Sequence, residues 1–141
     1  MAKLADIQRS LTGVLISKIE VDFRVTLVFL DHGSLALSCP FEIRLKDRSA
    51  LTIDPEGPKT DLLPVLEFVN ESIQEIMINH QGILLTASNG MKIRTYSDPD
   101  YESWKLSLNG PEGALVIALP GKDLAIWGPS PSQKLTDTKH P

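Results

Sequence analysis

Residues 16–33, ISKIEVDFRVTLVFLDHG, and residues 73–90, IQEIMINHQGILLTASNG, carry the same pattern of apolar and turn residues. Each stretch begins with a run that alternates apolar and polar residues, as a half-buried strand does, and continues through a break, a second strand and a glycine turn. Aligned without a gap, the two stretches match at five positions: Ile16 and Ile73, Ile19 and Ile76, Val21 and Ile78, Leu27 and Leu84, and Gly33 and Gly90. The sequence therefore predicts an internal repeat, over about residues 14–45 and 71–108.

The rest of the chain continues in short runs of strand type, at residues 104–108, 114–119 and 124–127, with Pro- and Gly-containing turns between them. A helix is expected from about Asp61 to Asn70, with Thr60 as its N-cap and Pro64 early enough to be tolerated. A further amphipathic turn or helix is expected through Leu4 and Ile7. The predicted fold class is mainly β (α+β), with two related antiparallel β-meander units joined by one short helix and packed as a sandwich or a partly open barrel.

Length and composition are those of a single globular domain. A chain of 141 residues can bury a substantial core, and 42% hydrophobic with 23% charged residues is ordinary for such a protein. We expect one domain over residues 1–127 and a disordered tail over residues 128–141, which are rich in Pro, Ser, Lys and Thr. No secretory signal and no apolar run of ~18 residues is visible, and Cys39 is alone. These features favour a cytoplasmic location without membrane association.

The charge balance bears on the kind of partner. The formal net charge is −4, and Arg and Lys are scattered rather than gathered in a basic run. Nucleic-acid binders usually present a basic face to the phosphates, so no nucleic-acid partner is expected. An acidic surface suits a basic protein partner, and it also serves simply to keep a protein soluble.

The sequence carries no pattern of established catalytic or metal chemistry. It lacks a Gly-x-Ser-x-Gly elbow, a phosphate-binding glycine loop and the spacings typical of metal-ligating His or Cys. We therefore expect no catalytic residue, no metal and no cofactor, and a structural role for Cys39. The repeat symmetry would allow Asp22, Asp31 and His32 to approach His80, but turn formation is by far the favoured explanation of these residues.

One acidic and aromatic segment stands out as a candidate partner-binding surface. Carboxylates of this segment would pair with Arg or Lys of a partner, and aromatic side chains would anchor the contact. The alternative is structural: the Asp-Pro-Asp sequence makes a turn, and the aromatic rings cover the sheet. The candidate residues are Asp98, Asp100, Tyr101, Glu102 and Trp104.

Several segments resemble a small, mainly actinobacterial family known as domain of unknown function 6188. They comprise residues 21–27, 31–35 and 40–41, Gly90, the tyrosine-glutamate-serine-tryptophan box at 101–104 and the box PGKDLAIW at 120–127. The resemblance covers about residues 11–127, and Lys122 stands where the family often has a second glycine. It implies a compact repeated β domain, and it transfers no activity, cofactor or catalytic residue.

Three functions of different classes remain open. The first is a non-enzymatic protein-binding domain, such as an immunity protein or antitoxin that neutralises a basic partner. The second is a carrier of a small apolar ligand held between curled sheets. The third is an uncharacterised enzyme that uses Asp22, Asp31, His32, His80 or the Asp98 to Glu102 cluster, which would require these groups to meet in one pocket. An exposed strand edge would in addition allow a homodimer.

Overall fold

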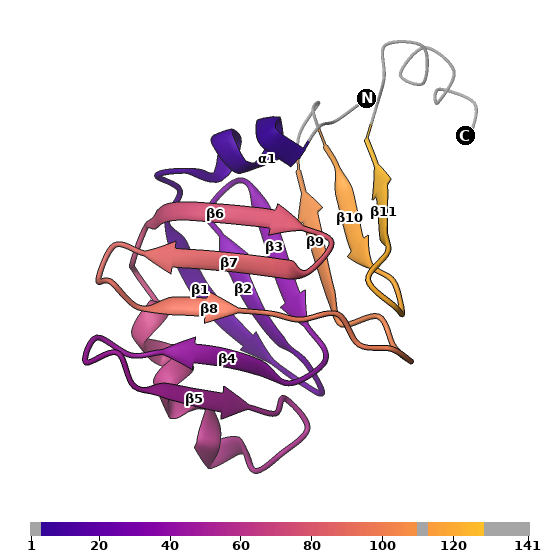
Figure 1. Cartoon of the computed structure of the whole chain (residues 1–141). Coiled ribbons are helices and arrows are strands. Elements are labelled where there is room, and N and C mark those ends of the chain that lie inside the picture. Colours follow the sequence, from indigo (N-terminus) through magenta and orange to yellow (C-terminus); the bar gives the residue numbers. More distant parts are fainter. Residues whose placement is uncertain (1–3, 110–112, 129–141) are drawn as a thin grey trace.

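Two antiparallel β-sheets packed face to face make up the computed structural model, which describes residues 4–109 and 113–128 (Figure 1). The elements follow one another as α1 (Leu4–Leu11), β1 (Ile16–Val21), β2 (Val25–Phe29), β3 (Gly33–Leu37), β4 (Phe41–Arg44), β5 (Ala50–Ile53), the 3-10 helix η1 (Lys59–Phe68), β6 (Ile73–Asn79), β7 (Gly82–Ala87), β8 (Lys92–Arg94), β9 (Trp104–Leu108), β10 (Leu115–Ala118) and β11 (Leu124–Trp127). One sheet has the order β1-β2-β3-β9-β10-β11 and the other β5-β4-β8-β7-β6. The predicted mainly β class is confirmed, and the two sheets do not close into a barrel in the described part of the chain.

Each copy of the repeat gives its fourth strand to the other sheet. Strands β1–β3 and β6–β8 form two separate three-stranded meanders. The next strand then crosses over, so that β4 pairs with β8 and β9 pairs with β3. The two predicted meander units are thus present, and each comprises three strands. Local alternation predicts a strand, but it does not specify the strand's hydrogen-bonding neighbour.

A pseudo-two-fold axis relates the two copies, and it passes between Leu15 and Ser72. These two residues, which match in the repeat, form an antiparallel bridge with each other. The hydrogen bonds that flank the bridge are reciprocal: Ile16 N donates to Glu71 O and Ile73 N donates to Val14 O, each at 2.8 Å. Equivalent residues of the two copies can form such a reciprocal bridge only when the two-fold axis runs between them.

The gapless alignment of the two copies holds in the first strand and fails after the first turn. Three residues separate the paired Val21 and Val25, whereas four separate the paired Ile78 and Ile83. Leu27 therefore corresponds to the fully buried Leu85 and not to Leu84, which lies on the outer face. Because side chains alternate between the faces of a strand, an alignment that is wrong by one residue matches buried residues of one copy with outward-facing residues of the other.

The 3-10 helix η1 joins the two copies, and α1 holds the equivalent place before the first copy. Helix α1 packs against β6 of the second copy, and η1 packs against β1 of the first. The expected helix from Asp61 to Asn70 is the 3-10 helix η1 over residues 59–68, and Pro58 rather than Thr60 stands at its N-cap, without a side-chain cap. Pro64 within the helix lacks the N–H that an α-helical hydrogen bond needs.

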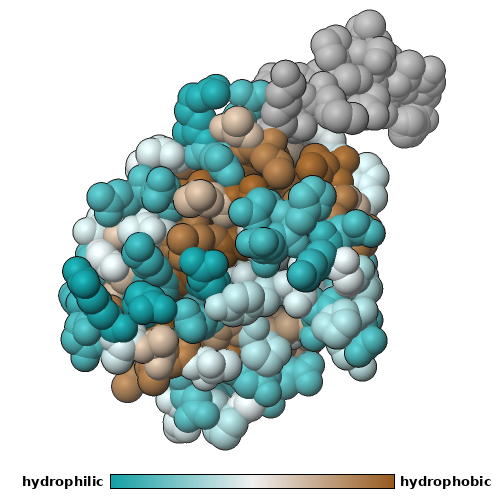
Figure 2. All heavy atoms as spheres, in the orientation of Figure 1, coloured by the Kyte–Doolittle hydropathy of each residue, from teal (hydrophilic) through white to brown (hydrophobic). Residues whose placement is uncertain are grey.

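The inner faces of both sheets and both helices contribute to one hydrophobic cluster. Its largest fully buried side chains are Trp104, Phe29, Phe41 and Phe68. Hydrophilic residues gather over the outer face of the five-stranded sheet, which is turned towards the viewer in Figures 1 and 2, whereas hydrophobic residues reach the surface beneath α1. In the described part of the chain, no helix combines the length and the apolar character that a bilayer crossing requires. The expected disordered tail lies, beyond Gly128, outside the described residues.

Candidate functional site

Four connections of the sandwich converge at one end and form an open groove of about 680 Å³. They are the β1–β2 turn, the β3–β4 crossover, the loop after β5 and the β8–β9 crossover, all at the lower right of Figure 1. We call this feature the acidic groove; it is lined by Phe23, Ser38, Cys39, Pro40, Asp54, Glu56, Asp98, Tyr101 and Glu102. Four of these nine residues are carboxylates, and none is Lys or Arg.

The β8–β9 crossover is an enlarged form of the β3–β4 crossover. Leu37 and Thr95 occupy corresponding places in the two copies, as do Phe41 and Trp104, because β4 and β9 pair in the same register with the opposite sheets. Three residues (38–40) complete the first crossover, whereas eight residues (96–103) fill the second. Three residues are thus enough to connect the sheets, and the longer loop adds surface that the connection itself does not need.

The longer loop is held in shape by Asp98. Its carboxylate accepts hydrogen bonds from the backbone N–H groups of Asp100 and Tyr101, at 2.8 and 3.1 Å. Its own carbonyl oxygen accepts the backbone N–H of Gly121 at 2.9 Å, which ties the loop to the β10–β11 turn. The turn that Asp98 forms with Asp100 and Tyr101 leaves the Tyr101 side chain 68% exposed. Asp98 is therefore a turn-forming residue as well as a lining residue.

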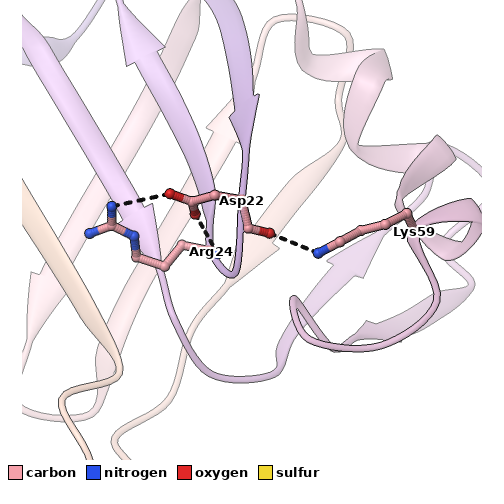
Figure 3. A network of polar contacts seen from close by, with 3 residues as sticks. All are labelled: Asp22, Arg24 and Lys59. Carbon is pink, nitrogen blue, oxygen red and sulfur yellow. Dashed lines mark hydrogen bonds and ion pairs between the residues drawn. The ribbon is translucent and has the colours of Figure 1, made fainter.

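The opposite wall of the groove is fixed by a network around Asp22 (Figure 3). The Asp22 carboxylate accepts the backbone N–H of Arg24 at 2.7 Å and pairs with its guanidinium at 3.4 Å. The Lys59 ammonium donates to the carbonyl oxygens of Asp22 and Pro55, at 2.8 Å each. This contact joins the β1–β2 turn, which carries Phe23, to the loop that carries the carboxylates after β5.

Two exposed aromatic rings belong to the groove. Phe23 is 61% exposed, and the Arg24 guanidinium lies over its ring, 4.8 Å from the centroid. Tyr101 belongs to the other crossover and is exposed to a similar degree. Exposed aromatic side chains are enriched in surfaces that bind another protein.

The electrostatics of the groove act on the pKa of its one thiol, Cys39. Burial raises the pKa of the Cys39 thiol, and the nearby carboxylates raise it further, in the order Asp98, Glu56 and Asp54. Both causes disfavour the thiolate, so Cys39 is a neutral thiol at pH 7 and a poor nucleophile. On the opposite wall, the hydrogen bonds from Arg24 lower the pKa of the Asp22 carboxyl.

The structure brings together three of the five candidate partner-binding residues. Asp98, Tyr101 and Glu102 line the groove, whereas Asp100 is exposed beside it. Trp104 is 1% exposed and belongs to the core, so its assignment to the binding surface is wrong. As the first residue of β9, it is turned inward by the strand alternation. Sequence reasoning missed Phe23, Asp54 and Glu56, which come from parts of the chain remote from residues 98–104.

Of the residues named in the enzyme hypothesis, Asp98 and Glu102 line the acidic groove, whereas the other Asp and the His residues lie apart. Asp22 is in the β1–β2 turn, and Asp31 and His32 are in the β2–β3 turn, at the other end of β2. A five-residue strand separates the two turns by roughly 17 Å. His80 lies in the β6–β7 turn, where its Nδ1 is 3.3 Å from the carbonyl oxygen of Lys122. Within residues 4–109 and 113–128, no three His, Cys, Asp or Glu side chains are grouped as metal ligands would be.

Comparison with known proteins gives one match. The model of a family described as a family of unknown function (DUF6188) matches residues 7–128. No curated protein and no solved structure matches the chain.

Proposed function

We propose that this chain, which belongs to the DUF6188 family of unknown function, is a non-enzymatic protein-binding domain that receives a basic segment of a partner in its acidic groove. The observation that carries the proposal is the composition of the groove, in which four carboxylates and two exposed aromatic rings face a common space without a lining cation. Complementary charge speeds association and fixes orientation, and aromatic anchors contribute affinity.

The enlarged β8–β9 crossover supports this proposal. The corresponding connection in the first copy joins the sheets with three residues, whereas this one uses eight and places Tyr101 and Glu102 at the groove. Loops that exceed what the scaffold needs often carry the function of a domain. The β8–β9 crossover is a loop of this kind, because its five additional residues place an aromatic ring and a carboxylate at the acidic groove.

Among protein-binding roles we favour that of an immunity protein or antitoxin, which neutralises a basic partner by covering its active site. A rigid sandwich end with fixed carboxylates suits such a role, because preorganised groups lose little entropy on binding. The turn hydrogen bonds of Asp98 and the Lys59 contact supply this preorganisation on the two walls. The alternative of an apolar-ligand carrier has less support, since the inner faces of the sheets pack against each other as one cluster.

The test compares two double variants with the same change in charge. Glu56→Lys with Glu102→Lys alters two exposed lining carboxylates, whereas Glu75→Lys with Glu67→Lys alters two exposed carboxylates that do not line the groove. Each substitution adds two positive charges, so both variants bring the formal net charge from −4 to 0. Tagged wild-type and variant proteins are used as bait in lysate of the native host, and captured proteins are identified by mass spectrometry.

A basic protein captured by the wild type and the control variant, released by salt and lost with the groove variant, is the expected result. The purified partner would then be titrated into each protein by calorimetry, with binding by the groove variant at least roughly a hundredfold weaker. A partner that binds all three proteins equally would contradict the proposed site. Failure of all three proteins to capture any basic partner would contradict the proposed function.

A further inference from the structure

A group of cations lies on the outer face of the five-stranded sheet, away from the acidic groove. Antiparallel pairing places Arg94 opposite Glu42 and Lys92 opposite Arg44, on neighbouring strands β8 and β4. Residues directly opposite each other share a face of the sheet, so the four side chains form a two-by-two arrangement. We call Arg44, Lys92 and Arg94 the cationic patch; together with Glu42 and Leu84 they line a depression of about 160 Å³.

The arrangement contains a pairing that sheets usually avoid. Lys92 and Arg44 are directly opposite each other, and like charges at such positions destabilise a sheet. On the other side of β8, the residues opposite Arg94 and Lys92 are Leu84 and Thr86, so β7 provides no neutralising carboxylate there. Pairs of residues that lower the stability of the fold without an evident compensating contact are typical of functional positions.

The single carboxylate of the depression is already engaged. Glu42 forms an ion pair with Arg44 at 3.5 Å, and a second guanidinium nitrogen of Arg44 donates to the carbonyl oxygen of Arg48. Lys92 and Arg94 have no ion-pair partner among the described residues. A chain with a net charge of −4 thus concentrates an excess of two positive charges in this depression.

We propose that the cationic patch binds a phosphate group, at a site separate from the acidic groove and with a role beyond the proposed function. The Arg94 guanidinium would form two parallel hydrogen bonds to phosphate oxygens, and the Lys92 ammonium would contribute a point charge. Arg44, held by Glu42 and Arg48, forms a fixed side of the site. The depression is small beside the ~300–1,000 Å³ of pockets for drug-sized ligands, which suits a phosphate group rather than a larger flat ligand.

The experiment is a titration followed by the backbone amide signals of the isotopically labelled full chain in nuclear magnetic resonance, at constant ionic strength. The probes are inorganic phosphate and O-phosphoserine, which represent free phosphate and a phosphate ester. Lys92→Gln with Arg94→Gln removes the two unpaired cations. Lys18→Gln with Lys105→Gln removes two exposed cations of the other sheet, and serves as the control for net charge.

Saturable shifts centred on β4 and β8 in the wild type and the control, with binding at least roughly tenfold weaker in the patch variant, would support the site. Tighter binding of O-phosphoserine would identify the source as a phosphate ester, and tighter binding of inorganic phosphate would identify the free anion. Shifts that do not saturate, or that are the same in the patch variant and the control, would overturn the proposal. So would saturable binding of poly-glutamate with no binding of either phosphate probe.

Discussion

Lys59 and Asp22 are 37 residues apart in sequence, and the ammonium group of one donates a 2.8 Å hydrogen bond to the carbonyl oxygen of the other. The same ammonium also donates to the carbonyl oxygen of Pro55. One side chain therefore joins the turn that carries Phe23 to the loop that carries Asp54 and Glu56. The acidic groove depends on this contact for the relative position of two of its walls.

Replacing Lys59 by Met should weaken the fold and loosen this end of the sandwich. Two hydrogen bonds from a charged donor are lost, but the site is largely exposed, so we expect a decrease of about 1 kcal/mol in the free energy of unfolding. Urea denaturation measures the change. Lys105→Met, at an exposed position of β9, is the control and should change stability by less than about 0.5 kcal/mol. Equal stabilities for the two variants would show that the Lys59 contact contributes nothing.

Cys39 reports the acidity of the groove without any partner. Because burial and nearby carboxylates raise its pKa, alkylation by iodoacetamide should rise with pH at a midpoint above that of an unstructured cysteine peptide. Glu56→Gln should lower this midpoint, and Glu67→Gln, outside the groove, should not. A Cys39 midpoint equal to that of the peptide and unaffected by Glu56→Gln would contradict the acidic environment.

The same shift has a consequence for stability at alkaline pH. The folded state holds the Cys39 proton more tightly than the unfolded state, so the contribution of this group is fully present below the unfolded pKa of the thiol. The contribution is lost as pH rises from the unfolded pKa through the raised folded pKa. Denaturation at several alkaline pH values should therefore show a smaller loss of stability in Cys39→Ser than in the wild type.

Trp104 and Phe41 should behave as equivalent core residues, because each is the first residue of the strand that crosses between the sheets. Trp104→Ala and Phe41→Ala should each reduce the free energy of unfolding by about 3–5 kcal/mol. Trp104→Phe should be milder, since the indole N–H has no hydrogen-bond partner among the described residues. Tyr101→Ala, at an exposed ring, should have little effect on stability. A large loss with Tyr101→Ala and a small one with Trp104→Ala would reverse the assignment of core and surface.

Gly33 should tolerate no side chain. Its φ is +142°, and an added Cβ would overlap the carbonyl oxygen of Ser107 on the neighbouring strand β9. Gly90 also has a positive φ, of +90°, but a Cβ there would meet open space. Gly90→Ala should therefore cost only the backbone strain of about 1–2 kcal/mol, and Gly33→Ala distinctly more, because the backbone of β9 must move. Thermal denaturation followed by circular dichroism compares the two variants, and equal losses would contradict the close approach of β3 and β9.

Much of the fold could be predicted from local patterns. The alternation in residues 16–21 and 73–78 identified β1 and β6, and the Asn89-Gly90 turn signal lies between β7 and β8. Part of the candidate site was also predicted, since Asp98, Tyr101 and Glu102 do line the groove. Trp104 was misassigned because composition shows that a segment is aromatic and acidic, but it does not show which strand position faces inward.

Register and strand pairing could not be predicted. The extra residue in the turn between Ile78 and Ile83 shifts the whole of β7 by one position, and a gapless alignment cannot show it. The crossing of β4 and β9 depends on pairing between residues remote in sequence, for which local periodicity carries no signal.

By itself, the sequence determined the strands, the repeat, the family and the absence of a familiar catalytic motif, because each depends on residue types at short spacings. Only the tertiary structure decided the exchange of fourth strands, the pseudo-two-fold axis at Leu15 and Ser72, and the acidic groove. The groove draws on four connections between residues 23 and 102, and packing of the two apolar inner faces brings them to one end. That packing is a collective effect of the whole core, so no single segment of the chain encodes it.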